Sequence, residues 1–439
     1  MNKGLLLRVA LDKGSGGALA PIFEDGSFEY IPIPENKETS ISSTYSSTLG
    51  RSKEPLSKFV PIKYADSQIH FDPEFETFTY GEPARPKLNQ LLNLQKGDLL
   101  IFYAGLQPHS SKDFDRIYII GYFEIERVEY FSGLSENSYP ELRLKFGKNA
   151  HFFRKTPDKE LVVAIGSRNG SKLLDKALPL GDCGRSKVAI KNKSFHSYTL
   201  PDLHSIGYKK SLQRAVGHKI TGLGLEKMTR YLKEGVASLV DENTTLRYYS
   251  MTADTGFAPN PRNGILTLAC CKPDIRNKAN IGDWVIGTHS TNKQSPFHGD
   301  QSLCYLARIS EKLTFDAYFN DIRFQTKKTE FHPQGDNIYY CLENKIFKQT
   351  PNPNHNKDNL AKDTKYDSVL ISDLFWYFGK RGYCSDLINK SRKIKFGSKG
   401  RLEYIRDTAF IKNLVSEISS NCRTGMLSEP ANYNIWLLS

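Results

Sequence analysis

A short pattern that occurs twice constrains the fold of this chain more than any other feature. Near the start the chain reads VALDKGSGGALAPIFEDGSFEYIPIP, and from Tyr249 it reads YSMTADTGFAPNPRNGILTLACCKP. Asp12 and Gly14 align with Asp254 and Gly256. Each copy reads as a strand, a loop rich in Gly and Pro, a tight turn and a second strand. The pattern therefore predicts two copies of one β-rich unit.

A second block follows in each copy. The first copy has GDLLIFYAG and then RIYIIGYFEIERVEYF, and the second has GDWVIGTHST and then SLCYLARISEKLTF. Each block starts with Gly-Asp, which predicts a turn into an apolar strand. The offset between copies falls from 242 residues at Asp12 and Asp254 to 185 residues at Asp98 and Asp283. The first copy therefore contains an insertion, which we place at 36–85; the alternative is a chance alignment of turn motifs.

Helical patterns lie between and after the β-rich units. Residues 208–236 and 407–421 carry apolar side chains near helical spacing. A chain of 439 residues exceeds one ordinary hydrophobic core, and a content of 12% aromatic residues favours strands. We therefore expect an α+β protein with domains at 1–200 and 245–439 and a helical connector at 201–244.

The charge and the cysteines narrow the class of protein. A net charge of +13 favours a polyanionic partner, although a generally basic proteome would also produce it. The seven cysteines are an odd number without a CxxC pair, which indicates a reducing cytoplasm rather than a disulfide framework. No apolar run reaches the roughly 20 residues that a membrane helix needs. We expect a cytoplasmic protein with no membrane partner.

Longer strings resemble two known families. The stretches APIFEDGSFEYIPIPE, HFDPEFETFTYGEP and KGDLLIFYAGL resemble the third type of nucleotide-modification-associated domain. The stretches DTGFAPNPRNGILTLACCKPDIR, GDWVIGT, GDNIYY and VLISDLFWYFG resemble the second type. This resemblance implies a setting in DNA-modification, restriction or phage systems, with other subunits as partners. The strands after Gly-Asp are also similar to PUA-like barrels, including EVE and ASCH domains, which implies that each β-rich unit is such a barrel.

Carboxylates are the candidates for catalysis. His70, Asp72, Glu74 and Glu76 alternate along the chain, so in an extended strand all four side chains point to one face. Such a cluster can bind a divalent cation or supply acid/base groups, or it is simply a solvated edge. We assign catalytic roles to Asp12, Asp72, Glu74 and Asp254 and no metal ligands. The sequence identifies no cofactor.

Amides and aromatic rings are the candidates for nucleotide binding. Asn260 and Asn263 carry amides that can read a base edge. Bases stack on aromatic faces, and the candidates for stacking are Tyr103, Trp284, Trp376 and Tyr377. The alternative is that these rings are core residues, because consecutive residues of a strand alternate between its faces.

A basic tract at 380–401 holds eight cations against one acidic residue, Asp386. Tracts of this kind neutralise phosphates and give affinity that depends on salt, although a solvated basic face looks the same in a sequence. The candidates for phosphate binding are Arg381, Arg392, Lys393, Lys395 and Arg401.

The adjacent Cys270 and Cys271 could include a nucleophile, with His289 less than 20 residues away. A cysteine in an apolar strand is more often simply buried. The spacing of His289 and His298 matches no zinc pattern.

Two functions remain open. The first is recognition or processing of modified nucleotides in DNA, in which the basic tract holds the backbone and an aromatic pocket holds a base. The alternative is an enzyme that acts on a base, nucleotide or precursor in a pocket lined by carboxylates. The expected partner is nucleic acid, with DNA favoured, or a nucleotide.

Overall fold

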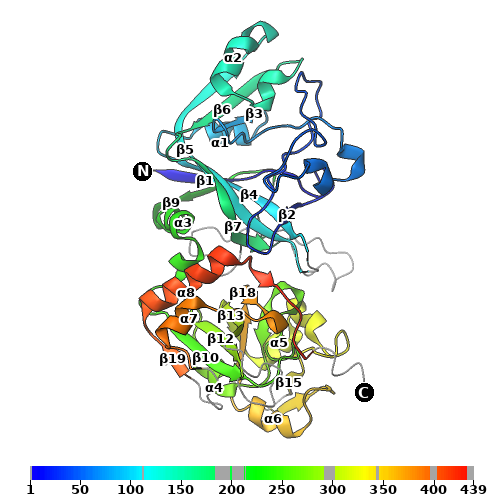
Figure 1. Ribbon diagram of the computed structural model, residues 1–439, viewed down its shortest axis with the longest axis vertical. Coiled ribbons are helices and arrows are strands. Elements are labelled where there is room, and N and C mark those ends of the chain that lie inside the picture. Colours follow the sequence, from blue (N-terminus) through cyan, green and yellow to red (C-terminus); the bar gives the residue numbers. More distant parts are fainter. Residues whose placement is uncertain are drawn as a thin grey trace.

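The protein is a mixed α+β structure in two parts. The computed structural model describes residues 2–110, 113–182, 198–199, 212, 214–290, 302–342, 346–395 and 403–432. In Figure 1 the first half of the chain forms the upper part and the second half the lower part, with helices α3 (Gly222–Glu234) and α8 (Thr408–Asn421) where they meet. The prediction of an α+β protein is confirmed, and the closer prediction of PUA-like barrels stays a prediction.

The first half is built on a sheet of nine strands among the described residues. They are β1 (Lys3–Arg8), β2 (Ala20–Ile22), β3 (Thr79–Glu82), β4 (Leu99–Pro108), β5 (Arg116–Ser132), β6 (Glu160–Gly166), β7 (Lys172–Asp182), β8 (Tyr198–Thr199) and β9 (His218–Thr221). The α-helices before α3 are α1 (Lys87–Leu92) and α2 (Tyr139–Phe146). The long strand β5 pairs with β4, β6 and β7. It therefore links β3 and β6 to the rest of the sheet.

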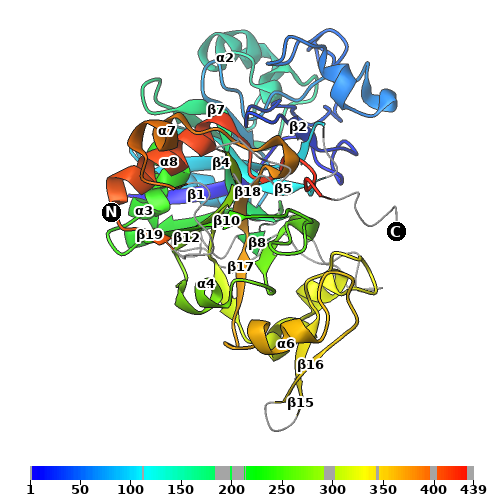
Figure 2. The same cartoon turned by 60° about the horizontal axis from the view of Figure 1, so that its bottom comes forward.

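The second half contains a six-stranded sheet, a three-stranded sheet and a hairpin in the described residues. Their strands are β10 (Leu246–Met251), β11 (Leu266–Leu268), β12 (Trp284–His289), β13 (Leu303–Arg308), β14 (Glu311–Leu313), β15 (Tyr339–Leu342), β16 (Ile346–Gln349), β17 (Val369–Ser372), β18 (Leu374–Tyr377), β19 (Glu403–Ile405) and β20 (Gly425–Met426). The α-helices before α8 are α4 (Pro273–Lys278), α5 (Phe315–Asn320), α6 (Asp358–Asp363) and α7 (Asp386–Ser391). Figure 2 shows the hairpin of β15 and β16 projecting near α6.

The two sheets share one arrangement, which explains the repeated sequence pattern. The first contains the order β9-β1-β4-β5, and the second contains β19-β10-β12-β13. In each, the two middle strands are parallel and the outer pairings are antiparallel. The helix that follows is α3 after β9 and α8 after β19. The two halves are therefore two versions of one unit.

The repeated Gly-Asp turn connects the parallel strands in the same way in both halves. Oδ1 of Asp98 accepts a hydrogen bond of 2.9 Å from the backbone N–H of Lys3, at the start of β1. Oδ1 of Asp283 accepts one of 3.1 Å from the backbone N–H of Thr245, just before β10. The preceding glycine has a φ of +85° at Gly97 and +95° at Gly282, a region that L side chains rarely adopt. The turn needs both residues, so the pattern recurs.

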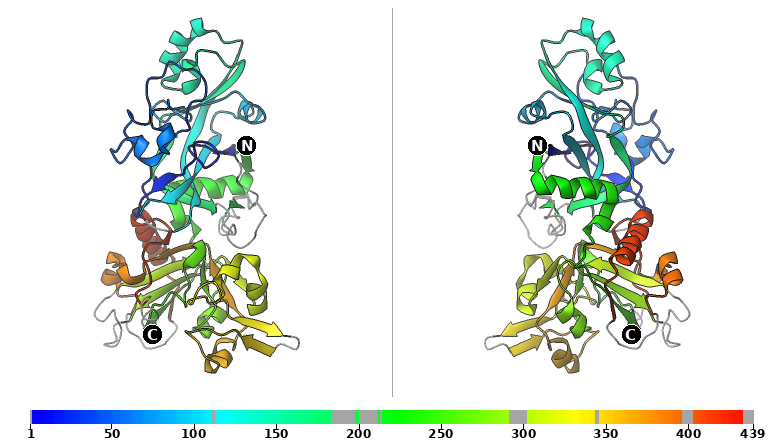
Figure 3. Two further views of the ribbon diagram at one scale, coloured as in Figure 1. Left: turned by 90° about the vertical axis from the view of Figure 1, so that its right-hand side faces the viewer. Right: turned by 90° about the vertical axis from the view of Figure 1, so that its left-hand side faces the viewer.

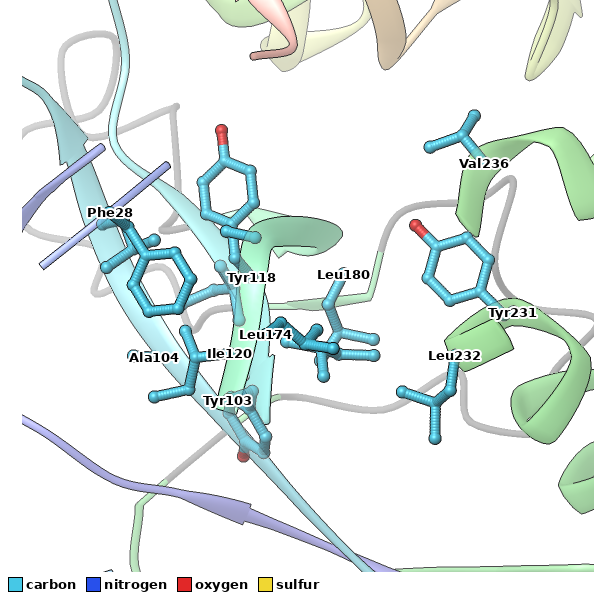
Figure 4. Packing of buried hydrophobic residues seen from close by; sticks show 14 of the residues in the cluster. Phe28, Tyr103, Ala104, Tyr118, Ile120, Leu174, Leu180, Tyr231, Leu232 and Val236 are labelled. Carbon is cyan, nitrogen blue, oxygen red and sulfur yellow. The ribbon is translucent and has the colours of Figure 1, made fainter. Parts of the chain in front are cut away.

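A hydrophobic core runs through both halves. In Figure 4, Leu174 and Leu180 of β7 lie on the side of the first sheet that faces Tyr231 and Leu232 of α3, and Ile120 lies on the other side beside Phe28. The buried positions of α3 recur at helical spacing, which makes one face of this helix apolar. The same buried cluster includes residues of the second half, namely Leu246, Trp284, Leu306, Trp376, Ile411 and Leu414. Figure 3 shows α3 and α8 between the two sheets from two sides.

The predicted domain boundaries are not sharp features of the fold. The predicted connector at 201–244 contains α3, but it also contributes β9, which pairs with β1 of the first sheet. The predicted insertion at 36–85 consists mainly of turns and ends in β3, which pairs with β6. The boundaries themselves stay a prediction. No helix among the described residues is long and apolar enough to cross a membrane.

Candidate functional site

A cavity of about 170 Å³ opens beside the Asp12 loop, where β1 ends. Its walls come from four segments that are distant in sequence: 8–10, 70–72, 80–83 and 151–154. Ile33, Lys87 and Arg214 complete the lining. The edge strand β3 supplies Tyr80, Gly81 and Glu82, and the turns before it supply His70 and Asp72.

Each of the two histidines in this cavity is held by a carboxylate. Nδ1 of His70 lies 2.7 Å from Oε2 of Glu35, and Nδ1 of His151 lies 2.7 Å from Oδ2 of Asp158. The two imidazole rings meet edge to face with their centroids 5.0 Å apart. These contacts occupy Nδ1, so Nε2 is the nitrogen that each ring can offer to a ligand.

Asp72 stands between the two rings. Its Oδ1 accepts hydrogen bonds from the backbone N–H of Gly81 at 2.7 Å and from Nδ2 of Asn149 at 3.1 Å. Its Oδ2 lies 3.7 Å from Nε2 of His151. The side chain of His151 is 2% exposed, and its Nε2 has no hydrogen-bond partner among the described residues. A buried nitrogen in this state calls for a partner.

Arg154 joins the two supporting carboxylates. Its guanidinium donates to both oxygens of Glu35 at 3.2 Å and to Oδ2 of Asp158 at 2.8 Å. Burial alone would raise the pKa of Glu35, but His70 and Arg154 outweigh it and lower the pKa to about 2. Burial also opposes the charge of Asp158, yet His151, Lys37 and Arg154 lower its pKa. Both carboxylates are therefore ionised and able to accept the Nδ1 proton.

The pKa values of His70 and His151 shift in opposite directions. Burial lowers the pKa of His70 in spite of Glu35. Burial also disfavours the charge on His151, but the hydrogen bond to Asp158 and the nearby negative charge of Asp72 raise its pKa. The ligand atoms of His70, Asp72 and His151 lie within 4.8 Å of one another. Two imidazoles and one carboxylate suit a divalent transition metal, and a carboxylate on the far nitrogen is the usual support for a metal-binding histidine.

Two other predicted carboxylates lie behind this cavity. Asp12 accepts hydrogen bonds from the backbone N–H groups of Gly14 and Ser15 and from Nε of Arg214, which lines the cavity. Glu74 accepts from the backbone N–H groups of Glu76 and Thr77 and shapes a turn. The expectation of one extended face holds for His70 and Asp72, and it is wrong for Glu74 because the chain turns back between Glu74 and Thr79.

The predicted polar residues of the second half serve the fold. Asp254 is almost fully buried and accepts hydrogen bonds from the Tyr377 hydroxyl and the backbone N–H of Ala431, and burial raises its pKa. Nδ2 of Asn260 donates to the backbone oxygen of Gln334 at 2.8 Å. Nδ2 of Asn263 donates to Oγ1 of Thr326 at 2.6 Å. These groups already hold neighbouring segments in place.

The predicted stacking residues Tyr103, Trp284, Trp376 and Tyr377 are completely buried. Trp284 and Trp376 stack on each other with their ring centroids 6.2 Å apart. Figure 4 places Tyr103 among apolar side chains. None of these faces is open to a base in this structure, because the central strands β4, β12 and β18 are covered on both sides.

The predicted phosphate-binding residues Arg381, Arg392, Lys393 and Lys395 are exposed, and Arg401 lies outside the described residues. Arg381 forms an ion pair of 2.6 Å with Glu24, and Lys393 pairs with Asp407. These cations are accessible to a phosphate backbone, and their pairs are of the weak, solvent-screened kind.

Four residues of this cavity and its support were not predicted from the sequence: His151, Arg154, Asp158 and Glu35. His151 and Asp158 flank a short turn, and no periodic pattern marks them. The pairing of β3 with β6 and the hydrogen bond from Nδ2 of Asn149 to Asp72 bring them beside Asp72. The nearest sequence signal was the pair of His70 and Asp72 itself.

Comparison with protein families gives one match for each half. The family called nucleotide modification associated domain 3 matches residues 3–217, and nucleotide modification associated domain 2 matches residues 243–436. No curated protein and no solved structure gave a significant match to the chain.

Proposed function

Because this chain joins a nucleotide modification associated domain 3 to a nucleotide modification associated domain 2, we propose that it is an enzyme that chemically alters a nucleotide or base. The reaction takes place in the cavity of the first half. The observation that carries the proposal is the set of His70, Asp72 and His151, with each imidazole supported by a buried, ionised carboxylate.

A divalent metal ion completes this site. Nε2 of His70, Nε2 of His151 and Oδ2 of Asp72 would hold this ion. Such an ion would supply Lewis-acid chemistry, by activating a water molecule or polarising a substrate oxygen. Glu35, Asp158 and Arg154 keep the rings in the required orientation, which is the task of an outer shell of ligand supports.

The size and charge of the cavity suit one part of a nucleotide. Its volume of about 170 Å³ is below the roughly 300–1,000 Å³ of pockets that enclose a whole small-molecule ligand. It therefore takes a base or a phosphate group and leaves the rest of the substrate outside. Arg8, Lys87 and Arg214 on its wall favour an anionic substrate.

The substrate belongs to DNA modification in the cytoplasm, in a modification or anti-phage system. The exposed cations at 380–395 support this part of the proposal, since they provide contacts for a phosphate backbone. An enzyme fits the molecule better than a pure reader of modified bases, because the rings proposed for stacking are buried whereas the acid, base and ligand groups line a cavity. PUA-like architecture of each half remains part of the proposal.

The test is a search for a mass change. The purified chain is freed of metal, supplied with Mn²⁺, Zn²⁺, Fe²⁺ or Mg²⁺, and incubated with nucleotides and with unmodified and phage-modified DNA. Liquid chromatography with mass spectrometry follows the products. We expect a product that requires one of the metals and that falls by at least about a hundredfold with Asp72→Asn, since the ion is then lost or displaced.

Asp66→Asn is the matched control, because Asp66 is exposed on the same segment and does not line the cavity. It should leave the yield unchanged. A product that forms equally with Asp72→Asn, or in the presence of a chelator, contradicts the proposal. Selective binding of modified DNA without any conversion, unaffected by Asp72→Asn, would instead establish a reader.

A further inference from the structure

A second and larger cavity lies at the matching place in the other half. It measures about 580 Å³ and opens where β10 ends, around the loop that contains Asp254. Its walls come from three parts of the chain: 249–258, 271–275 and 354–362. This volume lies within the range of roughly 300–1,000 Å³ that small-molecule pockets occupy. The residues on its wall do not belong to the histidine site of the first half.

Cys271 lies on this wall at a sharp turn from strand to helix. Strand β11 ends at Leu268 and helix α4 begins at Pro273. Between them, Cys271 has a φ of +58° and Lys272 a φ of +44°. Residues other than glycine rarely adopt this backbone conformation, and where they do the position is often functional. A nucleophile on such a turn is presented away from the sheet.

The backbone at Cys271 is fixed from both sides. Its N–H donates to Oδ1 of Asp363 at 2.9 Å, and its carbonyl oxygen accepts from Nε of Arg276 at 2.8 Å. Arg276 is itself buried. These contacts hold the left-handed turn against the cost of its conformation.

The thiol is the first member of a chain of three groups. Sγ of Cys271 lies 3.4 Å from Nε2 of His355, and Nδ1 of His355 lies 2.9 Å from Oδ2 of Asp363. The Tyr339 hydroxyl donates to the same carboxylate oxygen at 2.9 Å. Nucleophile, base and orienting carboxylate therefore stand in the order and at the spacing that nucleophilic catalysis requires.

The imidazole of His355 is held in place and strongly basic. The Phe257 ring meets the imidazole edge to face, with the two ring centroids 4.8 Å apart. Nε2 of Gln349 donates to the backbone oxygen of His355 at 2.8 Å. Burial would lower the pKa of His355, but hydrogen bonds to Asp363 and Cys271 raise it to about 9. At neutral pH an imidazole with this pKa carries a proton on Nε2, which it can give to a leaving group.

The neighbouring Cys270 provides the contrast. It is completely buried, its Sγ lies 3.4 Å from the backbone oxygen of Asp336, and burial raises its pKa well above the ordinary value. Only Cys271 combines contact with His355 and a place on the cavity wall. Of the adjacent cysteines, one is structural and the other is placed to react.

We propose that Cys271 is the nucleophile of an acyl-transfer site in the second half of the chain, with His355 as its base and Asp363 as the group that orients this base. The thiol proton resides on Nε2 of His355, and the Cys271 thiolate attacks the carbonyl carbon of an ester or amide. The leaving alkoxide or amine takes the proton from Nε2, which leaves a thioester on Cys271 and a neutral His355. His355 then removes a proton from the water molecule that attacks the thioester, which releases the carboxylic acid and restores the thiolate and the protonated His355.

The lining indicates an anionic acyl substrate. Lys272 and Lys362 are both on the wall, against one acidic residue, Asp274. The ammonium of Lys272 lies 4.6 Å from the centre of the Tyr249 ring, which keeps it at the cavity beside the nucleophile. In other strand–turn–helix sites the backbone N–H of the residue after the nucleophile helps to bind the oxyanion, and here that N–H belongs to Lys272.

The experiment uses activated esters on the full-length chain. The probes are neutral p-nitrophenyl acetate and anionic mono-p-nitrophenyl succinate. Intact-mass spectrometry and peptide mapping should find one acyl group per chain on Cys271, formed with a burst of p-nitrophenol. The rate of the burst should fall by at least about a hundredfold with His355→Gln, and Cys271→Ser should remove the thioester.

The controls separate reactivity from folding and from metal binding. Cys384→Ser changes an exposed cysteine outside this cavity and should leave the burst unchanged. Lys272→Gln should reduce the preference for the succinate ester. Acylation spread equally over several cysteines, or a burst unaffected by His355→Gln in a variant with an unchanged circular dichroism spectrum, overturns the proposal. Retention of zinc that disappears with Cys271→Ser would also overturn it and make the cluster a metal site.

Discussion

Three histidines in this chain are oriented by the same device, a carboxylate on Nδ1. Glu35 holds His70, Asp158 holds His151, and Asp363 holds His355. In each case the carboxylate fixes the ring and increases the basicity of the other nitrogen. The first two rings then suit a metal ion, and the third suits a thiol, because their neighbours are Asp72 and Cys271 respectively.

His355 should titrate far from the ordinary range of a histidine. Nuclear magnetic resonance of the imidazole should give a pKa of about 9, and Asp363→Asn should return the pKa toward the ordinary histidine value of 6.5. Because the folded pKa is the higher one, this group stabilises the fold fully below pH 6.5, and the contribution disappears as the pH rises through about 9. The contribution is about 3 kcal/mol at most. A wild-type titration near pH 6.5 would contradict the ion pair.

At this scale the sequence predicted only part of each site. His70 and Asp72 are two residues apart, so alternation along the chain was enough to associate them. Cys271 and His355 are separated by 84 residues, and no local pattern joins them. The nearer His289 lies on strand β12 of another sheet, where its Nδ1 is 2.8 Å from Oγ of Ser302.

Among the structural elements, the Gly-Asp turn is fixed by two backbone hydrogen bonds to its aspartate in each copy of the repeat. Asp98 accepts backbone hydrogen bonds from Lys3 and Gln95, and Asp283 accepts them from Thr245 and Asn280. Both carboxylates are buried, so their loss leaves backbone donors without partners.

Asp98→Ala should therefore lower the free energy of unfolding by about 2–4 kcal/mol, and Asp283→Ala should have a similar effect in the other half. Guanidinium denaturation followed by circular dichroism measures both. Asp66→Ala, at an exposed position, should change the value by less than about 0.5 kcal/mol. An Asp98→Ala variant as stable as the control would show that the turn does not need its carboxylate.

The elements that the sequence predicted well are those with strong periodicity. The predicted helix at 407–421 is α8, Thr408–Asn421, and the predicted helix at 208–236 contains α3, Gly222–Glu234. Strands β9 and β19 were missed because they are short and gain their stability from pairing with β1 and β10. Such edge strands carry little pattern of their own.

At the scale of the whole molecule, the two halves are held together by buried polar contacts as well as by the common core. The guanidinium of Arg116 on β5 donates to the backbone oxygens of Asp373 and Gly264, both at 2.8 Å. Asp113 and Arg423 form an ion pair of 3.0 Å that is almost fully buried. The two cavities lie at equivalent positions of the repeat, where β1 and β10 end, but their chemistry differs because their lining loops differ between the halves.

The central claim is that the first half holds a metal ion, and metal binding tests it directly. The chain freed of metal is titrated with Zn²⁺ and with Mn²⁺ by calorimetry, and the bound metal is measured by elemental mass spectrometry. We predict one ion per chain, affinity lower by more than about a hundredfold with His151→Gln, and affinity lower by about 10–100-fold with Glu35→Gln, which removes only a support. Cys271→Ser should leave the ion in place. A chain that binds no ion, or one whose ion survives His151→Gln, would contradict the account.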